Sequence, residues 1–151
     1  MKSLAIIPCG NKKIWDKKEG VGPVPAQDAY IGTFHKLCRA YAEKFHTHWV
    51  ILSAKHGYLQ AEDTVSSPYN LSFSHKSDEI ISIRRLSEQI KDKELDQFQL
   101  LVVLTGRKYK PIVEKSFGTG YEIQMPLLGS RGIGEMQQKL KRALEEGRPI
   151  S

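Results

Sequence analysis

Three uninterrupted apolar runs, each followed by a segment with helical spacing, constrain the fold of this chain more than any other feature. The runs are Leu4 to Ile7, Trp49 to Leu52 and Leu100 to Leu104. Because apolar and polar residues do not alternate within them, they are typical of strands that are covered on both faces. A weaker run, Tyr121 to Met125, predicts a fourth strand.

Apolar residues recur every three or four positions between these runs, which predicts helices. The predicted helices cover Gln27 to Phe45, Asp78 to Lys91, a short segment from Tyr109 to Val113, and Ile133 to Leu144. A strand–helix order repeated four times predicts an α/β fold: a three-layer, Rossmann-like, mostly parallel sheet of about four to five strands with flanking helices. A length of 151 residues fits a single α/β domain over residues 1–151.

Composition narrows the setting and the partners. No apolar run approaches the roughly 18 residues of a membrane span, and the first run is too short for a signal peptide, so we expect a cytoplasmic protein without a membrane partner. Two cysteines and no zinc spacing predict neither a disulfide framework nor a metal, and we expect no cofactor. The net charge of +6 favours an anionic partner such as a nucleotide or nucleic acid, or marks only a mildly basic protein. The oligomeric state stays open.

Small, hydroxyl-bearing and cationic residues follow the predicted strands. The first strand runs into Pro8-Cys9-Gly10, the second into Ser53-Ala54-Lys55-His56-Gly57, and the third into Thr105-Gly106. Ligands of open α/β sheets bind beyond the carboxyl ends of the strands. We therefore expect these segments to form one functional site.

The candidate catalytic residues are Cys9, Lys13, Lys55 and His56. Nearby lysines would lower the pKa of Cys9 and make it a nucleophile, but the role of a small residue that lines the pocket at a tight turn is favoured over that of a nucleophile. His56 can act as an acid or base near neutral pH, and Lys55 can bind a phosphate or carboxylate. Successive side chains on a strand diverge, so one of this pair is expected to be structural.

The candidate ligand-binding residues combine flexible backbone, hydroxyls and aromatic rings. They are Gly10, Lys12, Tyr30, Ser53, Gly57, Tyr69, Thr105, Gly106, Tyr109, Gly129, Gly132 and Gly134. The glycines from 129 to 134 open a helix and resemble a phosphate loop or, alternatively, a glycine-rich cap. Tyr69 and Trp15 are candidates for stacking on a base or for anchoring their loops.

Other residues of the same types are expected to be structural. Cys38 lies on the apolar stripe of a predicted helix and is read as core. The histidines without metal spacing are expected at the surface or as caps: His35, His46, His48 and His75. The long segment from Ser53 to Lys76 carries too many apolar residues for disorder, so we expect it to pack over the site.

The motifs resemble an uncharacterised bacterial and phage family. They are Pro8-Cys9 with Lys12 and Lys13, Asp28 with Tyr30, Leu52 to Leu59, Pro68-Tyr69, Gly106 with Tyr109, and Pro126 to Leu140. More distantly, the chain is similar to the peroxide-stress protein YaaA, which implies nucleic-acid binding. It is also similar to the PC-x-x-x-K domain of archaeosine synthase, which implies work on a deazaguanine.

These observations support two functional hypotheses. The first is an enzyme that binds or modifies a nucleotide, nucleobase or nucleic-acid base at the strand ends, as a transferase or hydrolase. The second is a non-catalytic DNA- or RNA-binding or stress-response module, in which the spread of lysines and arginines matters more than a pocket. A small-molecule sensor is a third reading.

Overall fold

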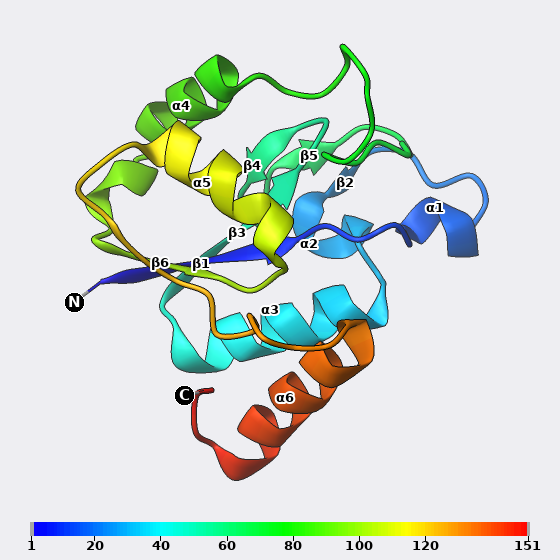
Figure 1. The fold of residues 1–151 in the computed structure, drawn as a ribbon. Helices are drawn as coiled ribbons and strands as arrows, with labels where there is room; N and C mark the ends of the chain where they lie inside the picture. The colour runs from blue at the N-terminus through cyan, green and yellow to red at the C-terminus, as the bar shows by residue number, and fades with distance from the viewer. Residues whose placement is uncertain (1, 151) are drawn as a thin grey trace.

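A central sheet of five strands organises the computed structural model, which describes residues 2–150. The strands are β1 (Ser3–Pro8), β3 (His48–Ser53), β4 (Gly57–Leu59), β6 (Leu100–Val103) and β7 (Glu122–Gln124). They lie in the order β4, β3, β1, β6, β7 (Figure 1). All neighbours are parallel except β4, which pairs antiparallel with β3. The mostly parallel α/β sheet predicted from the apolar runs is confirmed.

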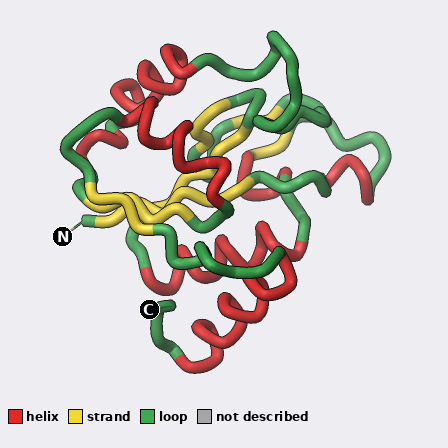
Figure 2. Tube along the Cα trace, in the orientation of Figure 1, coloured by secondary structure: helices red, strands yellow, loops and turns green. Residues whose placement is uncertain are grey.

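Helices cover both faces of this sheet and give the predicted three layers (Figure 2). One face carries α3 (Thr33–Phe45) and α6 (Ile133–Glu146), and the other carries α4 (Ile83–Asp92) and α5 (Lys110–Phe117). The remaining elements are short: α1 (Ile14–Lys17), α2 (Ala26–Ala29), the 3-10 turns η1 (Leu95–Gln97) and η2 (Arg107–Tyr109), and a two-stranded sheet of β2 (Val24–Pro25) and β5 (Thr64–Val65).

The side chains of β1 show how the layers are held together. Successive residues of a strand point to opposite faces. Ala5 and Ile7 therefore pack on the side of α3 and α6, while Leu4 and Ile6 pack on the side of α4 and α5. All four are buried. A strand in the middle of the sheet that is apolar on both faces produces the continuous run seen in the sequence.

The crossovers define where a ligand would bind. The chain leaves β1 through α3 on one face and leaves β6 through α5 on the other face. The strand order therefore reverses between β1 and β6, which are neighbours in the sheet. In doubly wound sheets the crevice beyond the carboxyl ends of such a strand pair is the usual ligand site.

The structure differs from the predicted helix over Gln27 to Phe45. That segment is split into α2 and α3 by an extended stretch from Tyr30 to Gly32. Lys13 forms a β-bridge with Tyr30, and the amide of Ile31 donates to the carbonyl of Lys12 at 3.1 Å. These long-range bonds to the first loop replace helical ones, so the helix has to start again after Gly32.

Two further differences arise from local signals. The helix predicted from Asp78 begins at Ile83, where Ser82 caps it by accepting a hydrogen bond from the amide of Arg85 at 3.1 Å. The strand β4 was not predicted because three residues are too few to show a period. No helix in the described part of the chain is long and apolar enough to cross a membrane.

Candidate functional site

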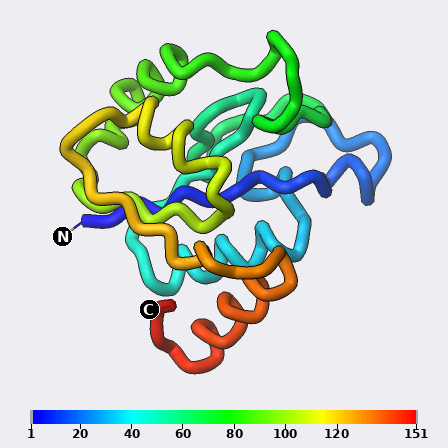
Figure 3. Tube along the Cα trace, viewed as in Figure 1, coloured from blue at the N-terminus to red at the C-terminus, as the bar shows by residue number. Residues whose placement is uncertain are grey.

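A cavity of about 630 Å³ lies at the carboxyl ends of β1 and β6. Its walls come from the loop after β1, the start of α3, the end of β3, the loop before α4, the segment after β6 and the first turns of α6. The residues concerned are Pro8 to Lys12, Gly32 to His35, Leu52, Ala54, Asn70 to His75, Thr105, Lys108, Tyr109, Ile133 and Gln137. The segments that follow β1 and β3 leave from the end of the sheet opposite the N-terminus (Figure 3). The segment expected to pack over the site does so through residues 70–75.

Five predicted ligand-binding or catalytic residues form part of the cavity wall: Cys9, Gly10, Lys12, Thr105 and Tyr109. Gly106 is the next residue after Thr105 and caps η2. The ring of Tyr109 packs edge to face on Phe73, with 5.8 Å between the ring centroids. Burial raises the pKa of Tyr109 to about 12, so its hydroxyl is neutral at physiological pH. One aromatic wall of the cavity is therefore built from two distant segments.

A second group of predicted residues lies behind this wall, as a hydrogen-bonded cluster of Tyr30, Ser53 and Tyr69, here called the tyrosine cluster. The hydroxyl of Tyr69 bonds with Ser53 Oγ at 2.7 Å and with the hydroxyl of Tyr30. Ser53 Oγ also accepts from the amides of Lys55 and His56, at 3.2 and 3.1 Å. Because these amides occupy its lone pairs, Ser53 donates to Tyr69, and Tyr69 donates onward to Tyr30.

Lys13 is buried against the tyrosine cluster, with only 4% of its surface exposed. Its ammonium donates to the carbonyls of Asn11 at 2.9 Å and Gly10 at 3.4 Å, and lies 4.5 Å from the ring centre of Tyr69. Burial lowers its pKa, while the charges of Cys9 and Asp16 oppose that change. Lys13 therefore fixes the turn of the first loop and places a cation behind the cavity.

Cys9 joins the cavity to the tyrosine cluster. Its side chain is part-exposed on the cavity wall, near Lys13 and the Tyr69 hydroxyl. Burial raises the pKa of the Cys9 thiol, and this outweighs the lowering by Lys13 and Tyr69. The expectation of a lowered pKa is wrong, because the burial of the thiol outweighs the charge of Lys13. Cys9 is a neutral thiol at the base of the cavity.

Lys55 and His56 flank the tyrosine cluster rather than the cavity. The ammonium of Lys55 lies 5.6 Å from the ring centre of Tyr69, and the imidazole of His56 packs edge to face on the same ring at 5.1 Å. Burial and the charge of Lys55 lower the pKa of His56. Its Nε2 atom is covered and has no hydrogen-bond partner in the described structure. Lys55 itself is exposed.

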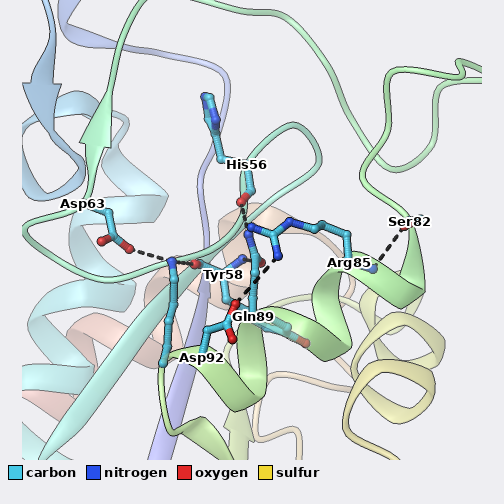
Figure 4. Close-up of polar contacts among 8 residues, drawn as sticks. His56, Tyr58, Asp63, Ser82, Arg85, Gln89 and Asp92 are labelled. Carbon is cyan, nitrogen blue, oxygen red and sulfur yellow. Dashed lines mark hydrogen bonds and ion pairs between the residues drawn. The ribbon is translucent and has the colours of Figure 1, made fainter.

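Gly57 begins β4 in the hairpin formed by β3 and β4, and α4 packs against it. It has a φ of +76°, and a Cβ there would stand 2.1 Å from Oε1 of Gln89. Gln89 accepts from the amide of Tyr58 at 2.9 Å and donates to the carbonyl of His56 at 2.8 Å. The His56 side chain points away from α4 while its carbonyl faces Gln89 (Figure 4). This side-chain clamp holds the segment that carries Lys55 and His56.

The same clamp continues at the end of α4. Lys93 donates to the carbonyl of Tyr58 and to Asp63 (Figure 4). The carboxylate of Asp63 also accepts from the amide of Gln60 at 2.7 Å. The hydroxyl of Tyr58 in turn bonds with Ser116 of α5 at 2.8 Å. The hairpin is therefore fastened to the helix layer on one face, while its other side supports the tyrosine cluster.

The predicted phosphate loop is placed differently from the expectation. Gly129, Gly132 and Gly134 are exposed, and none of them is among the residues of the cavity wall. The first turn of α6 carries Glu135, which pairs with Arg131 at 3.2 Å and with Lys139 at 3.8 Å. An acidic side chain at this helix start opposes an anion there. The alternative of a glycine-rich cap fits these contacts.

The stacking candidates are anchors. Trp15 donates its indole N–H to the carbonyl of Val21 at 3.0 Å, within the first loop. Tyr69 is held by Ser53 and Tyr30 through its hydroxyl and by Lys13 over its ring. These contacts lie within the protein and fit the alternative that each side chain anchors its loop.

His35 is a cavity residue that the sequence reading missed. It was expected at the surface or as a cap, yet only 2% of it is exposed, and the centre of its imidazole lies 5.5 Å from that of the Tyr30 ring. The signal was present in the sequence, because His35 precedes the buried Cys38 by three positions and Ala42 by seven. A histidine on the apolar face of a helix belongs to the interior. Cys38 is core, as predicted.

The loop before α4 was predicted to pack over the site, but none of the loop residues that line the cavity was among the predicted site residues. Asn70, Leu71, Ser72, Ser74 and His75 join Phe73 on the cavity wall. Within residues 2–150, no group of three or more His, Cys, Asp or Glu side chains is arranged to hold a metal ion. The donors that the cavity offers to a ligand are backbone amides, hydroxyls and cations.

Comparison with known proteins identifies relatives over almost the whole chain. Residues 4–142 match the model of a family of unknown function, DUF6884. The chain is 45% identical over 146 residues to the protein named "Uncharacterized protein YfjM" of Bacillus subtilis (strain 168), covering 97% of each sequence. The predicted resemblance to an uncharacterised bacterial family is confirmed.

Proposed function

Because this chain belongs to DUF6884, a family of unknown function, we propose its function from the cavity: it is an enzyme that binds and modifies a nucleotide, nucleobase or nucleic-acid base. The observation that carries the proposal is that one cavity combines an aromatic wall with a set of anion donors. Phe73 and Tyr109 form the aromatic wall. The first turn of α3, Lys12 and Lys108 supply the anion donors. A nucleotide presents this same pair of chemistries, a flat base and a phosphate.

The dimensions of the cavity support a ligand of this size. About 630 Å³ falls within the range of roughly 300 to 1,000 Å³ that is usual for small-molecule sites. Stacking of a base on an aromatic side chain contributes about 1–3 kcal/mol and tolerates any base. The aromatic wall would therefore hold a base, while other contacts select among bases.

In this proposal Cys9 is the reactive group nearest the ligand. It alone among the four predicted catalytic residues is part of the cavity wall. Lys13 supplies a cation behind it, and Lys55 and His56 surround the ring of Tyr69 on the far side of the tyrosine cluster. Proton transfer by His56 or Lys55 would require the tyrosine cluster to relay it. A reducing compartment such as the cytoplasm would keep Cys9 as a thiol.

Calorimetric titration with nucleoside monophosphates, nucleosides and 7-deazaguanine bases tests the proposal. We expect at least one nucleotide to bind, and Tyr109→Ala to weaken its binding about tenfold through the loss of a stacking face. Tyr121→Ala is the matched control, because Tyr121 packs on Phe117 away from the cavity. No heat of binding across the whole panel, or equal losses of affinity in both variants, would refute the proposal.

A second candidate function is a non-catalytic DNA- or RNA-binding module. It is favoured by one observation: Lys12, Lys55 and Lys108, which are all exposed, come from three loops that follow the carboxyl ends of neighbouring strands. Phosphate contacts would make oligonucleotide affinity fall steeply between about 50 and 200 mM salt. If oligonucleotides bind in this way while mononucleotides do not bind, the module replaces the enzyme as the preferred function.

A further inference from the structure

The first turn of α3 has backbone donors without partners. Its N-cap is Gly32, which has no side chain to cap the helix, and the first helical hydrogen bond runs from the amide of Lys36 to the carbonyl of Gly32. The amides of Thr33, Phe34 and His35 have no hydrogen-bond partner within residues 2–150. All three residues are part of the cavity wall. The donors therefore remain available to a ligand.

The charges around this turn favour an anion. The first turn of α3 contains no acidic residue, so the positive end of the helix dipole is not neutralised by its own side chains. Lys12 leaves the chain beside the N-cap, since a Cβ on Gly32 would stand 3.9 Å from that of Lys12. By contrast, α4 is capped by Ser82, and α6 carries Glu135 in its first turn.

His35 provides an independent indication that the turn is built for a ligand. Its Nδ1 atom lies 2.7 Å from the carbonyl oxygen of Pro8 and, because a carbonyl only accepts, must carry the proton. Burial lowers the pKa of His35, which keeps the ring neutral. Its Nε2 atom is then an acceptor, and it has no partner although the residue is 98% buried in the cavity wall. Buried polar atoms without a partner are uncommon, and each calls for an explanation such as a bound group.

We propose that the first turn of α3 binds the phosphate of a sugar phosphate. The amides of Thr33, Phe34 and His35 donate to the phosphate oxygens, and Nε2 of His35 accepts a hydrogen bond from a hydroxyl of the sugar. Helix starts bind phosphate in this way because free amides and the helix dipole act together. The ligand must carry a donor beside its anion, since the lone pair of His35 calls for an O–H or N–H group.

This inference deepens the proposed function, on which it rests for the identity of the base, but the phosphate site can be tested without a base. A matched pair of variants isolates one amide. Thr33→Pro removes the N–H at the first helical position, where proline is well tolerated, and Thr33→Ala keeps it. Gly32 has φ −68° and ψ 152°, a conformation that a following proline accepts. Both variants are expected to fold.

The first experiment titrates the protein with inorganic phosphate and follows the backbone amides by NMR. We expect the largest shifts at Thr33, Phe34 and His35. Thr33→Pro should raise the dissociation constant about tenfold relative to Thr33→Ala, which corresponds to one lost hydrogen bond to a charged group. Equal affinity of the two variants, or shifts confined to exposed lysines, would overturn the assignment.

The second experiment compares ribose 5-phosphate with inorganic phosphate. The wild-type protein should bind the sugar phosphate more tightly, and its binding should move the imidazole Nε2 resonance of His35. His35→Phe keeps an aromatic ring of similar shape, and it should reduce the preference for the sugar phosphate by roughly fivefold or more. If the preference persists in His35→Phe with an unchanged fold by NMR, His35 is not the acceptor.

The outcomes separate this site from the proposed function. Phosphate binding at α3 with no added affinity for any nucleotide supports the subsite and refutes the nucleotide proposal. Nucleotide binding that is indifferent to Thr33→Pro supports the proposed function and refutes the subsite. Nucleotide binding that is weakened by Thr33→Pro and spared by Thr33→Ala supports both.

Discussion

The side-chain amide of Gln89 occupies the space in which a side chain on Gly57 would stand. A Cβ at Gly57 would lie 2.1 Å from Oε1 of Gln89 and 2.7 Å from Cδ1 of Ile81. The same amide group bonds to the backbone on both sides of Gly57. This position therefore requires glycine for its positive φ and for the close approach of α4.

Gly57→Ala should lower the free energy of unfolding by about 3 kcal/mol, because the left-handed backbone and the clash with Gln89 add. Gly20→Ala is the control, since Gly20 also has a positive φ, +74°, but no atom lies within 4 Å of a Cβ there. Its cost should be about 1 kcal/mol. Urea denaturation measures both. Equal costs would show that Gln89 moves aside freely.

Ser53→Ala should destabilise the protein by about 3 kcal/mol. The hydroxyl is buried and bonds to Tyr69 and to the amides of Lys55 and His56, so its removal leaves the two amides without a partner and takes one of the two bonds of the Tyr69 hydroxyl. Ser87→Ala is the comparison, because Ser87 makes one bond, to the carbonyl of Ser116 at 2.9 Å, and should cost about 1 kcal/mol. A cost for Ser53→Ala no greater than that for Ser87→Ala would mean that water replaces the hydroxyl.

Stability should fall as the pH falls below about 6.5, the value at which histidine titrates in an unfolded chain. Burial lowers the pKa of His35 in the folded state. Between this lowered pKa and the pKa of the unfolded chain, the unfolded state binds more protons than the folded state, so acid favours unfolding. The stability that the neutral ring contributes is fully present above pH 6.5 or so and is lost below it, with a slope of at most about 1.4 kcal/mol per pH unit.

Unfolding experiments at about pH 7.5 and 5.5 measure this slope. His35→Phe should reduce it, even if the variant is less stable at both pH values. Leu37→Ala, a change on the same helix without a titrating group, should lower stability equally at both. A slope that is the same in the wild type and in His35→Phe would contradict a neutral buried His35.

Cys9 should react slowly with iodoacetamide at neutral pH, because burial raises the pKa of its thiol. In a Cys38→Ala background, in which Cys9 is the one cysteine left, the native protein should be alkylated more slowly than the same protein in denaturant. Lys13→Met should slow the reaction further by removing the charge that lowers this pKa. Mass spectrometry follows the reaction. Faster alkylation of the folded protein would identify Cys9 as an activated nucleophile.

The sequence predicted the layers well because the strands β1, β3 and β6 are buried on both faces. Such strands are read directly from continuous apolar runs. The break between α2 and α3 could not be read in this way, since it depends on bonds from Lys12 and Lys13 to a segment about 18 residues away. Local periodicity contains no information on such pairing.

The cavity lies at the edge of the sheet where the site was predicted, because that prediction rested on the strand ends. The division into a cavity and a tyrosine cluster was not predicted, since it depends on which way Tyr69 and Lys13 turn. A phosphate loop was predicted before α6 because several glycines stand close together there, whereas a single glycine, Gly32, precedes α3. The two helix starts differ in charge, because α6 carries Glu135 in its first turn and α3 carries no acidic residue there. The prediction took no account of this charge.

The cavity at the ends of β1 and β6 is assembled from six separate stretches of chain between Pro8 and Gln137. No continuous fragment contains its walls, so a ligand that binds there recognises only the completed tertiary structure. Such a ligand raises the melting temperature of the whole molecule in proportion to the logarithm of its concentration. Thermal protection thus becomes an assay that can screen chemical libraries before any reaction is known.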